Sequence, residues 1–216
     1  MAIKHAFTSP KTDGVDTTLV RPVDWNADHV GSGIKIQDAD GDTSWDVEQT
    51  ANEDKIHGNV KGVEAFLLDD AGVLTLAKQS RVAAHRSVNQ NILTSTWTKI
   101  NLNAEDYDEQ GEFDPTTNYR FTAKKAGYYF VVGQARYVLA TLANARCYAD
   151  VRKNGVESIP MVFCYDGSQE MGAICIHIFQ LAVNDYLELW TWQDSGSTIA
   201  VRGEYLHNRL CIYKIG

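Results

Sequence analysis

The stretch that most constrains the fold is residues 118–138, which read NYRFTAKKAGYYFVVGQARYV. From Tyr128 onward it is rich in aromatic and β-branched side chains, which favour a pleated, packed surface. Gly127 ends a short polar corner before this run and supplies the backbone freedom that a sharp corner needs. Apolar residues occupy both alternating positions, so the run predicts an inner strand of a β-sandwich or a strand at a subunit contact.

The rest of residues 80–216 continues this β pattern. Asn154-Gly155 is a two-residue hairpin signal, and Asn184-Asp185 stands between two apolar runs as a second turn. Many short strands with tight turns and no helical period predict a sandwich or jelly roll. The ten predicted strands cover residues 81–85, 97–102, 119–122, 127–138, 146–153, 158–163, 173–183, 186–193, 199–205 and 209–215.

One predicted strand, residues 173–183, is apolar on both faces. Ile174, Ile176 and Ile178 alternate with Cys175, His177, Phe179 and Leu181. In an antiparallel sandwich, one face of each sheet is normally solvated. We therefore expect a neighbouring subunit to cover part of one sheet, and the alternative is a sandwich with an exposed apolar edge.

The first 79 residues have a different character. Residues 1–30 are dense in turn formers and show neither strand nor helix periodicity, which predicts an extended arm that orders against a partner. Trp25 either anchors that arm in a partner's pocket or folds back on its own chain. Residues 31–79 alternate short apolar pieces with Asp/Gly turns at 38–42, 54–58 and 69–72, and they read as short strands. One chain has too few apolar residues here to close a core, whereas several identical chains around an axis could share one.

Charge and cysteine usage exclude some classes of function. The chain carries a net charge of −8, with 7 Lys+Arg against 14 Asp+Glu in residues 1–79, which disfavours nucleic-acid binding. It holds no apolar run long enough to span a bilayer, and its start lacks a secretory h-region, so we expect folding in a cytosol and no membrane insertion. Cys147, Cys164, Cys175 and Cys211 form no metal-binding spacing, and we expect buried free thiols.

We expect no enzyme, no cofactor and no bound metal. The D-x-D-G-D piece at residues 38–42 invites calcium, but it departs from the EF-hand spacing, and Asp and Gly also make turns without an ion. The acidic cluster in residues 105–112 could hold a glycosidase carboxylate pair, although carboxylates crowded on one loop are more often a solvated turn. There is no G-x-S-x-G elbow and no H-x-x-x-H pair.

Four motifs, in this order, resemble the C1q/TNF-like jelly roll: FTAKKAGYYFVVGQ, VRKNGV, IHIFQLAVNDYLELWTWQ and the terminal NRLCIYKIG. The resemblance covers about two-thirds of the chain and implies an all-β, ten-stranded jelly-roll knob over residues 80–216 that forms a homotrimer. The residues that we expect at the trimer interface are Tyr128, Phe130, Ile176, Ile178, Phe179, Trp190 and Tyr213.

The N-terminal part resembles bacteriophage fibre and structural proteins through MAIKHA, LVRPVDWNADH, DADGDT and AGVLTL. This implies a virion protein assembled in the host cytoplasm, with an attachment arm (1–30), a β-rich trimeric shaft (31–79) and a knob that binds a host-surface glycan or protein. The alternative is a head fibre or decoration protein with a stabilising role. The predicted attachment residues are Leu19, Arg21, Pro22, Asp24, Trp25 and Asn26, and the predicted host-contact residues, on loops, are Tyr107, Phe113, Asn144, Tyr165 and Asp166.

Overall fold

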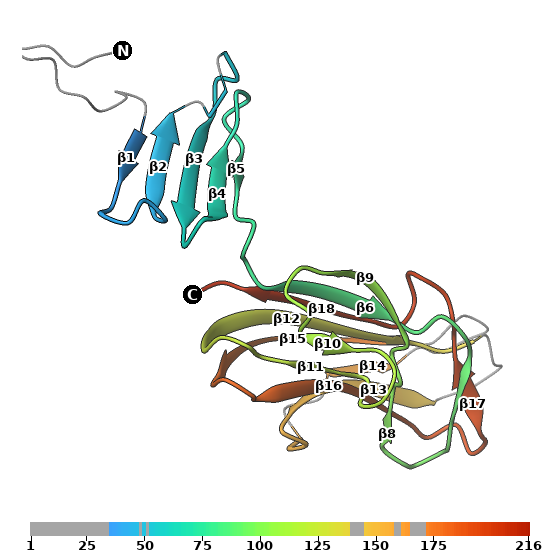
Figure 1. Cartoon of the computed structure of the whole chain (residues 1–216). Helices are drawn as coiled ribbons and strands as arrows, with labels where there is room; N and C mark the ends of the chain where they lie inside the picture. Colours follow the sequence, from blue (N-terminus) through green and yellow to red (C-terminus); the bar gives the residue numbers. More distant parts are fainter. Residues whose placement is uncertain (1–34, 48, 51, 139–144, 158–160, 165–171) are drawn as a thin grey trace, which may run out of the picture. The chain divides into compact units, whose positions relative to one another are not determined.

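The computed structural model describes residues 35–47, 49–50, 52–138, 145–157, 161–164 and 172–216, with the side chains of 161–164 excepted. The described residues form strands, turns and loops, and none of them is in a helix (Figure 1). The protein is therefore all-β, as predicted. The chain divides into two compact units between Lys78 and Gln79, and each is described by itself.

The N-terminal unit is an antiparallel meander in which every strand pairs with the next one along the chain. Its strands are β1 (Lys35–Gln37), β2 (Ser44–Val47), β3 (Ile56–Val60), β4 (Val63–Leu68) and β5 (Leu74–Thr75). The turn predicted at residues 54–58 is wrong in its second half, because Ile56 and His57 pair with Val47 and Asp46. The reversal comes earlier, at Asn52 and Asp54, which adopt positive φ.

The C-terminal unit contains two large antiparallel sheets. One sheet has the order β15 (Gly172–Leu181), β12 (Gly127–Arg136), β18 (Arg209–Lys214), β6 (Arg81–His85) and β9 (Ala104–Asp108). The other has the order β10 (Phe113–Asp114), β11 (Arg120–Thr122), β16 (Tyr186–Gln193), β13 (Arg146–Lys153) and β14 (Met161–Cys164), with β8 (Thr98–Lys99) also on β16. A small ribbon pairs β7 (Gln90–Ile92) with β17 (Ile199–Val201).

The pairing of these strands is nested. β6 pairs with β18, β11 with β16, β12 with β15 and β13 with β14. The strands of the first half of the unit thus pair in reverse order with those of the second half. Successive pairs belong alternately to one sheet and to the other. A long hairpin wrapped in this way is a jelly roll. The strand order alone therefore establishes the jelly roll that the sequence motifs predicted.

The core lies between the two sheets. In β12 the odd-numbered residues Tyr129, Val131, Gly133 and Ala135 are buried, and the even-numbered residues face outward. At Gly133 the sheets come so close that a Cβ would lie 2.8 Å from Cys175 of one sheet and from Leu189 and Val151 of the other. The aromatic part of residues 118–138 is thus an inner strand of the sandwich.

Several predicted strand bounds are confirmed, whereas the predicted strands 97–102 and 199–205 are strand only at Thr98–Lys99 and Ile199–Val201. One further segment contains strands where a loop was predicted. Residues 81–85, 146–153 and 186–193 are strands with those bounds. The acidic cluster of residues 105–112, predicted as a solvated turn, and Phe113, predicted on a loop, instead belong to a segment that contains β9 and β10. Glu112 is buried there and accepts hydrogen bonds from the Ser80 hydroxyl and, at 3.0 Å, from the Lys124 backbone N–H.

The described cysteine side chains form no disulfide. Cys147 and Cys175 are fully buried, and Cys211 is half-buried on the outer face of β18. Burial raises the pKa of Cys175 to about 12, so this thiol stays protonated and unreactive. The prediction of buried thiols is confirmed for Cys147 and Cys175, whereas the side chain of Cys164 lies outside the described ones.

Candidate functional site on the outer face of the jelly roll

The outer face of the sheet β15-β12-β18 is apolar where a solvated face would be polar. Ile174, Ile176 and Ile178 of β15 are 48%, 54% and 62% exposed. Across the register, Ile176 lies opposite Val132 and Ile178 lies opposite Phe130, which in turn lies opposite Tyr213 of β18. We call this set, together with Tyr128, the knob patch. An exposed, contiguous apolar surface of this kind marks an interaction site.

The structure brings five of the seven predicted interface residues together in the knob patch: Tyr128, Phe130, Ile176, Ile178 and Tyr213. The other two lie elsewhere. Phe179 faces inward and packs against the core, with its ring centroid 5.3 Å from that of His177. Trp190 belongs to the opposite sheet, where its indole N–H donates to Glu188 at 3.1 Å.

A charged cluster stands at the β9 end of the same sheet. The Asp106 carboxylate lies 2.6 Å from Arg209 Nη2 and 2.7 Å from His85 Nδ1, the latter at ion-pair distance without hydrogen-bond geometry. Arg209 also stacks on the Tyr205 ring, 4.9 Å from its centroid. Sequence reasoning missed this cluster, because Asp106 was placed in a loop and the register that joins it to β6 and β18 is a tertiary feature.

The predicted host-contact residues do not gather at one place. Phe113 is only 7% exposed and pairs with Phe121 in the core, so we remove it from the contact set. Tyr107 lies in strand β9 rather than in a loop, and its hydroxyl contacts that of Tyr213. Burial and this contact raise the pKa of Tyr107. Asn144, Tyr165 and Asp166 lie outside the described residues, as do the predicted attachment residues Leu19, Arg21, Pro22, Asp24, Trp25 and Asn26.

The second sheet carries a cluster of aromatic rings around Arg152, on its outer face. The guanidinium carbon lies 4.8 Å from the ring centroid of Trp97 and 4.4 Å from that of Trp190. Tyr148 extends the row, in edge contacts with Trp97 and Trp192. Such interleaving of Arg with Trp and Tyr is common at binding surfaces. The alternation of side chains in the sequence indicates that these residues share a face of the sheet. Which rings contact one another depends on the cross-strand register.

The acidic turn at residues 38–42 has a structural explanation. Asp38, Asp40 and Asp42 are exposed, and one carboxylate oxygen of each lies within 4.8 Å of the others. The Asp38 Oδ1 atom accepts hydrogen bonds from the Gly41 N–H at 3.0 Å and the Thr43 N–H at 3.2 Å. The Thr43 backbone bond is the main cause that lowers the pKa of Asp38. Asp38 therefore shapes the turn itself.

Among the described residues there is no helix long and apolar enough to cross a membrane. No protein-family model matches the chain, and no curated protein matches it.

Solved structures resemble the C-terminal unit in fold. Eiger TNF from S. frugiperda is 8% identical, with a TM-score of 0.48 over 64% of this chain and 93% of that one. Murine APRIL is 8% identical, with a TM-score of 0.49 over 64% of this chain and 100% of that one. The globular domain of the zebrafish complement 1qA protein is 15% identical, with a TM-score of 0.43 over 63% of this chain and 98% of that one. This likeness concerns the fold alone; the jelly roll of the C-terminal unit is established by its own nested strand pairing.

Proposed function

We propose that the protein is a fibre or spike of a bacteriophage particle, attached through its N-terminal arm and presenting a homotrimeric jelly-roll knob to the host surface. The observation that carries the assembly is the knob patch. Its three isoleucines, each about half exposed or more in one chain, would lose most of that exposure between copies. Burial of apolar area is the main favourable term in such association.

The virion context rests on the N-terminal sequence motifs. They resemble phage fibre segments, and residues 31–79 have the Asp/Gly-rich turns of such segments. The jelly-roll knob supports a role at the particle surface, because loops and faces held by a rigid sandwich are suited to recognition.

The proposed assembly leaves the second sheet free for a host molecule. If the knob patch lies between copies, the outer face with Trp97, Tyr148 and Arg152 is turned away from the contact, since it belongs to the opposite sheet. Trp, Tyr and Arg are the residues that contribute most at binding hot spots. We place the host contact on this face and on the loops beside it.

A cell-binding assay tests the proposal. Labelled full-length protein is added to bacterial strains and to an array of their surface polysaccharides, beside the variant Ile176→Lys/Ile178→Lys. We expect the native protein to bind some strains and the variant to bind them at least tenfold more weakly, because three linked sites gain avidity that single sites lack. Val183→Lys, at an exposed position just after β15, is the control and should bind like the native protein.

The alternative, a decoration or head-fibre protein, makes a different prediction. Such a protein binds the phage particle through residues 1–30 and binds no host cell or polysaccharide. Tight particle binding with no host binding on any susceptible strain would replace the receptor role by this structural one.

A further inference from the structure

The turn that follows β13 holds the only Asn-Gly step of the sequence, Asn154-Gly155. Asparagine is a chemically labile residue, and it is most labile before glycine, which has no side chain to shield its own backbone nitrogen. In deamidation the Gly155 nitrogen bonds to the Asn154 Cγ atom, the Cγ–Nδ2 bond breaks and ammonia leaves. Water then opens the succinimide ring. The sequence chemistry alone therefore makes this turn a modification site.

The fold holds the Asn154 amide at both of its polar atoms. The Nδ2 atom donates to Asp185 Oδ1 at 2.8 Å, and the Oδ1 atom accepts the Tyr186 backbone N–H at 2.9 Å. The backbone N–H of Asn154 also donates to the Tyr186 carbonyl, at 2.9 Å. We call these three hydrogen bonds, made by Asp185 and Tyr186, the Asp185 clamp. The amide carbon reaches a new partner only after side-chain bonds of the clamp have broken.

The turn also restricts the movement that the attack requires. Asn154 and Gly155 both have positive φ, 53° and 76°, and the Val156 N–H donates to the Lys153 carbonyl at 2.9 Å. Closing the succinimide ring changes the backbone rotation between Asn154 and Gly155. Ring closure therefore requires the turn to open.

Asp185 is itself held in place. Its Oδ2 atom binds Lys153 Nζ at 2.8 Å and accepts the Ala182 backbone N–H at 2.8 Å, which leaves Oδ1 directed at Asn154. Asn154 and Gly155 are exposed, so water reaches the turn. Protection of this step therefore comes from the hydrogen bonds and not from burial.

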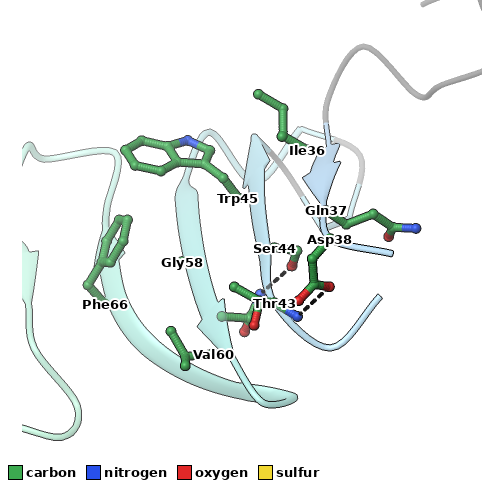
Figure 2. A pocket seen from close by; sticks show the side chains of 10 residues that line it. Ile36, Gln37, Asp38, Thr43, Ser44, Trp45, Gly58, Val60 and Phe66 are labelled. Carbon is green, nitrogen blue, oxygen red and sulfur yellow. Dashed lines mark hydrogen bonds between the residues drawn. The ribbon is translucent and has the colours of Figure 1, made fainter. Parts of the chain in front are cut away.

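Among the described residues, one other glycine follows an Asn or an Asp, at Asp40-Gly41 in the N-terminal unit. There the fold holds the attacking nitrogen, because the Gly41 N–H donates to Asp38 Oδ1 at 3.0 Å. Figure 2 shows the Asp38 carboxylate beside Thr43, whose N–H it also accepts, at 3.2 Å. The two steps are thus restrained at opposite ends of the bond that would form, and only the Asn154 step depends on Asp185.

We propose that Asn154-Gly155 is a site of spontaneous deamidation that the Asp185 clamp keeps closed in the folded chain, and that modification there opens this end of the jelly roll irreversibly. Water opens the succinimide at either carbonyl and leaves an aspartate or an isoaspartate at position 154. The aspartate would set a second carboxylate against Asp185 with no donor between them, and like charges so close repel each other. The isoaspartate would add a methylene to the main chain of a tight turn.

The test measures the rate of deamidation at Asn154 in the full-length protein, by chymotryptic peptide mapping and mass spectrometry. Asp185→Ala removes the carboxylate of the clamp. Lys153→Met removes another partner of that carboxylate and leaves the Asn154 bond in place, so it controls for a general loosening of the turns. Isoaspartate formation at Asp40-Gly41 in the same samples verifies equal incubation. Native protein in urea gives the rate without the clamp, and circular dichroism verifies that the variants are folded.

We expect folded native protein to deamidate at least tenfold more slowly than the same protein in urea, because a site that reacts only when open reacts in proportion to its open population. Lys153→Met should keep the native rate, and Asp185→Ala should approach the rate in urea. Equal rates in folded Asp185→Ala and native protein would overturn the role of the clamp, as would equally fast loss in Lys153→Met. Equal rates of native protein in and out of urea would overturn the protection altogether.

A second measurement applies even where Asp185→Ala does not fold. Asn154→Asp supplies the aspartate product directly. It should unfold at a lower urea concentration than native protein at pH 7, and the difference should shrink as acid places a proton between the two carboxyls. Equal stability of the two proteins at pH 7 would contradict the proposed opening of the turns.

Discussion

At the scale of single residues, Asp185 joins two turns of the jelly roll. Its carboxylate binds Lys153 Nζ and the Asn154 amide, each at 2.8 Å, and accepts the Ala182 backbone N–H at 2.8 Å. The hydrogen bond from Lys153 is the largest of the causes that lower the pKa of Asp185 to about 2. In the unfolded chain the pKa of an Asp is about 3.9.

The pH dependence of Asp185 follows from this difference. A carboxyl with a lowered folded-state pKa stabilises the fold above about pH 4, and that contribution is lost as the pH falls from about 4 to about 2. We expect Asp185→Asn to lower the free energy of unfolding at pH 7 and to have a much smaller effect near pH 2. Urea titrations of the native protein and of Asp185→Asn between pH 7 and pH 2 measure this difference in the free energy of unfolding. Asp70→Asn, on an exposed turn, is the control. A constant difference between the proteins at all pH values would contradict the assignment.

Gly133 is the second residue with a clear consequence. Its position in β12 has no room for a methyl group, since Cys175, Leu189 and Val151 would each lie 2.8 Å from it. We expect Gly133→Ala to destabilise the C-terminal unit by about 1–3 kcal/mol, the usual cost of overpacking a dense core. Urea unfolding gives the value, and the double variant Gly133→Ala/Cys175→Ala should recover part of the loss. A fully stable single variant would show that the sheets can move apart.

At the scale of elements, the sequence predicted the long strands and the tight hairpins but not the short edge strands. β12 and β15 were predictable because the alternation of side chains that marks a strand is visible in their own sequences. β9 and β10 were hidden because this segment is rich in acidic residues whose partners are distant in sequence. Asp106 of β9 pairs with Arg209, and Glu112, just before β10, accepts a hydrogen bond from the Ser80 hydroxyl. The knob patch was predictable from the sequence as an apolar face. The sequence could not show that Trp190 lies outside this patch, because both faces of β16 carry large apolar side chains.

The hairpin at Asn154-Gly155 gives a prediction at this scale. Both residues have positive φ, 53° and 76°, and a Cβ on Gly155 would meet nothing closer than the Tyr186 hydroxyl at 3.4 Å. The cost of a side chain there is therefore conformational. We expect Gly155→Ala to lose about 1 kcal/mol of stability, and Gly155→Asn to lose less because Asn tolerates this region. Urea unfolding should rank the three proteins in that order, and an alanine variant as stable as native would refute the turn geometry.

At the scale of the whole molecule, the two units share one feature. Each has an apolar surface that its own described residues leave open: the knob patch on one unit and, on the other, the face of the β1–β5 sheet that carries Ile36, Val60 and Leu74. Both surfaces would bury more apolar area, and so contribute more stability, in an assembly of identical chains. Assembly is therefore the central claim, and the attachment and recognition roles depend on it.

Sedimentation equilibrium of the full-length protein at micromolar concentration tests that claim most directly. We predict a single species of three times the 24.1 kDa chain mass, and dissociation of the knob contact in Ile176→Lys/Ile178→Lys. A native protein that sediments at 24.1 kDa throughout would contradict the proposed assembly.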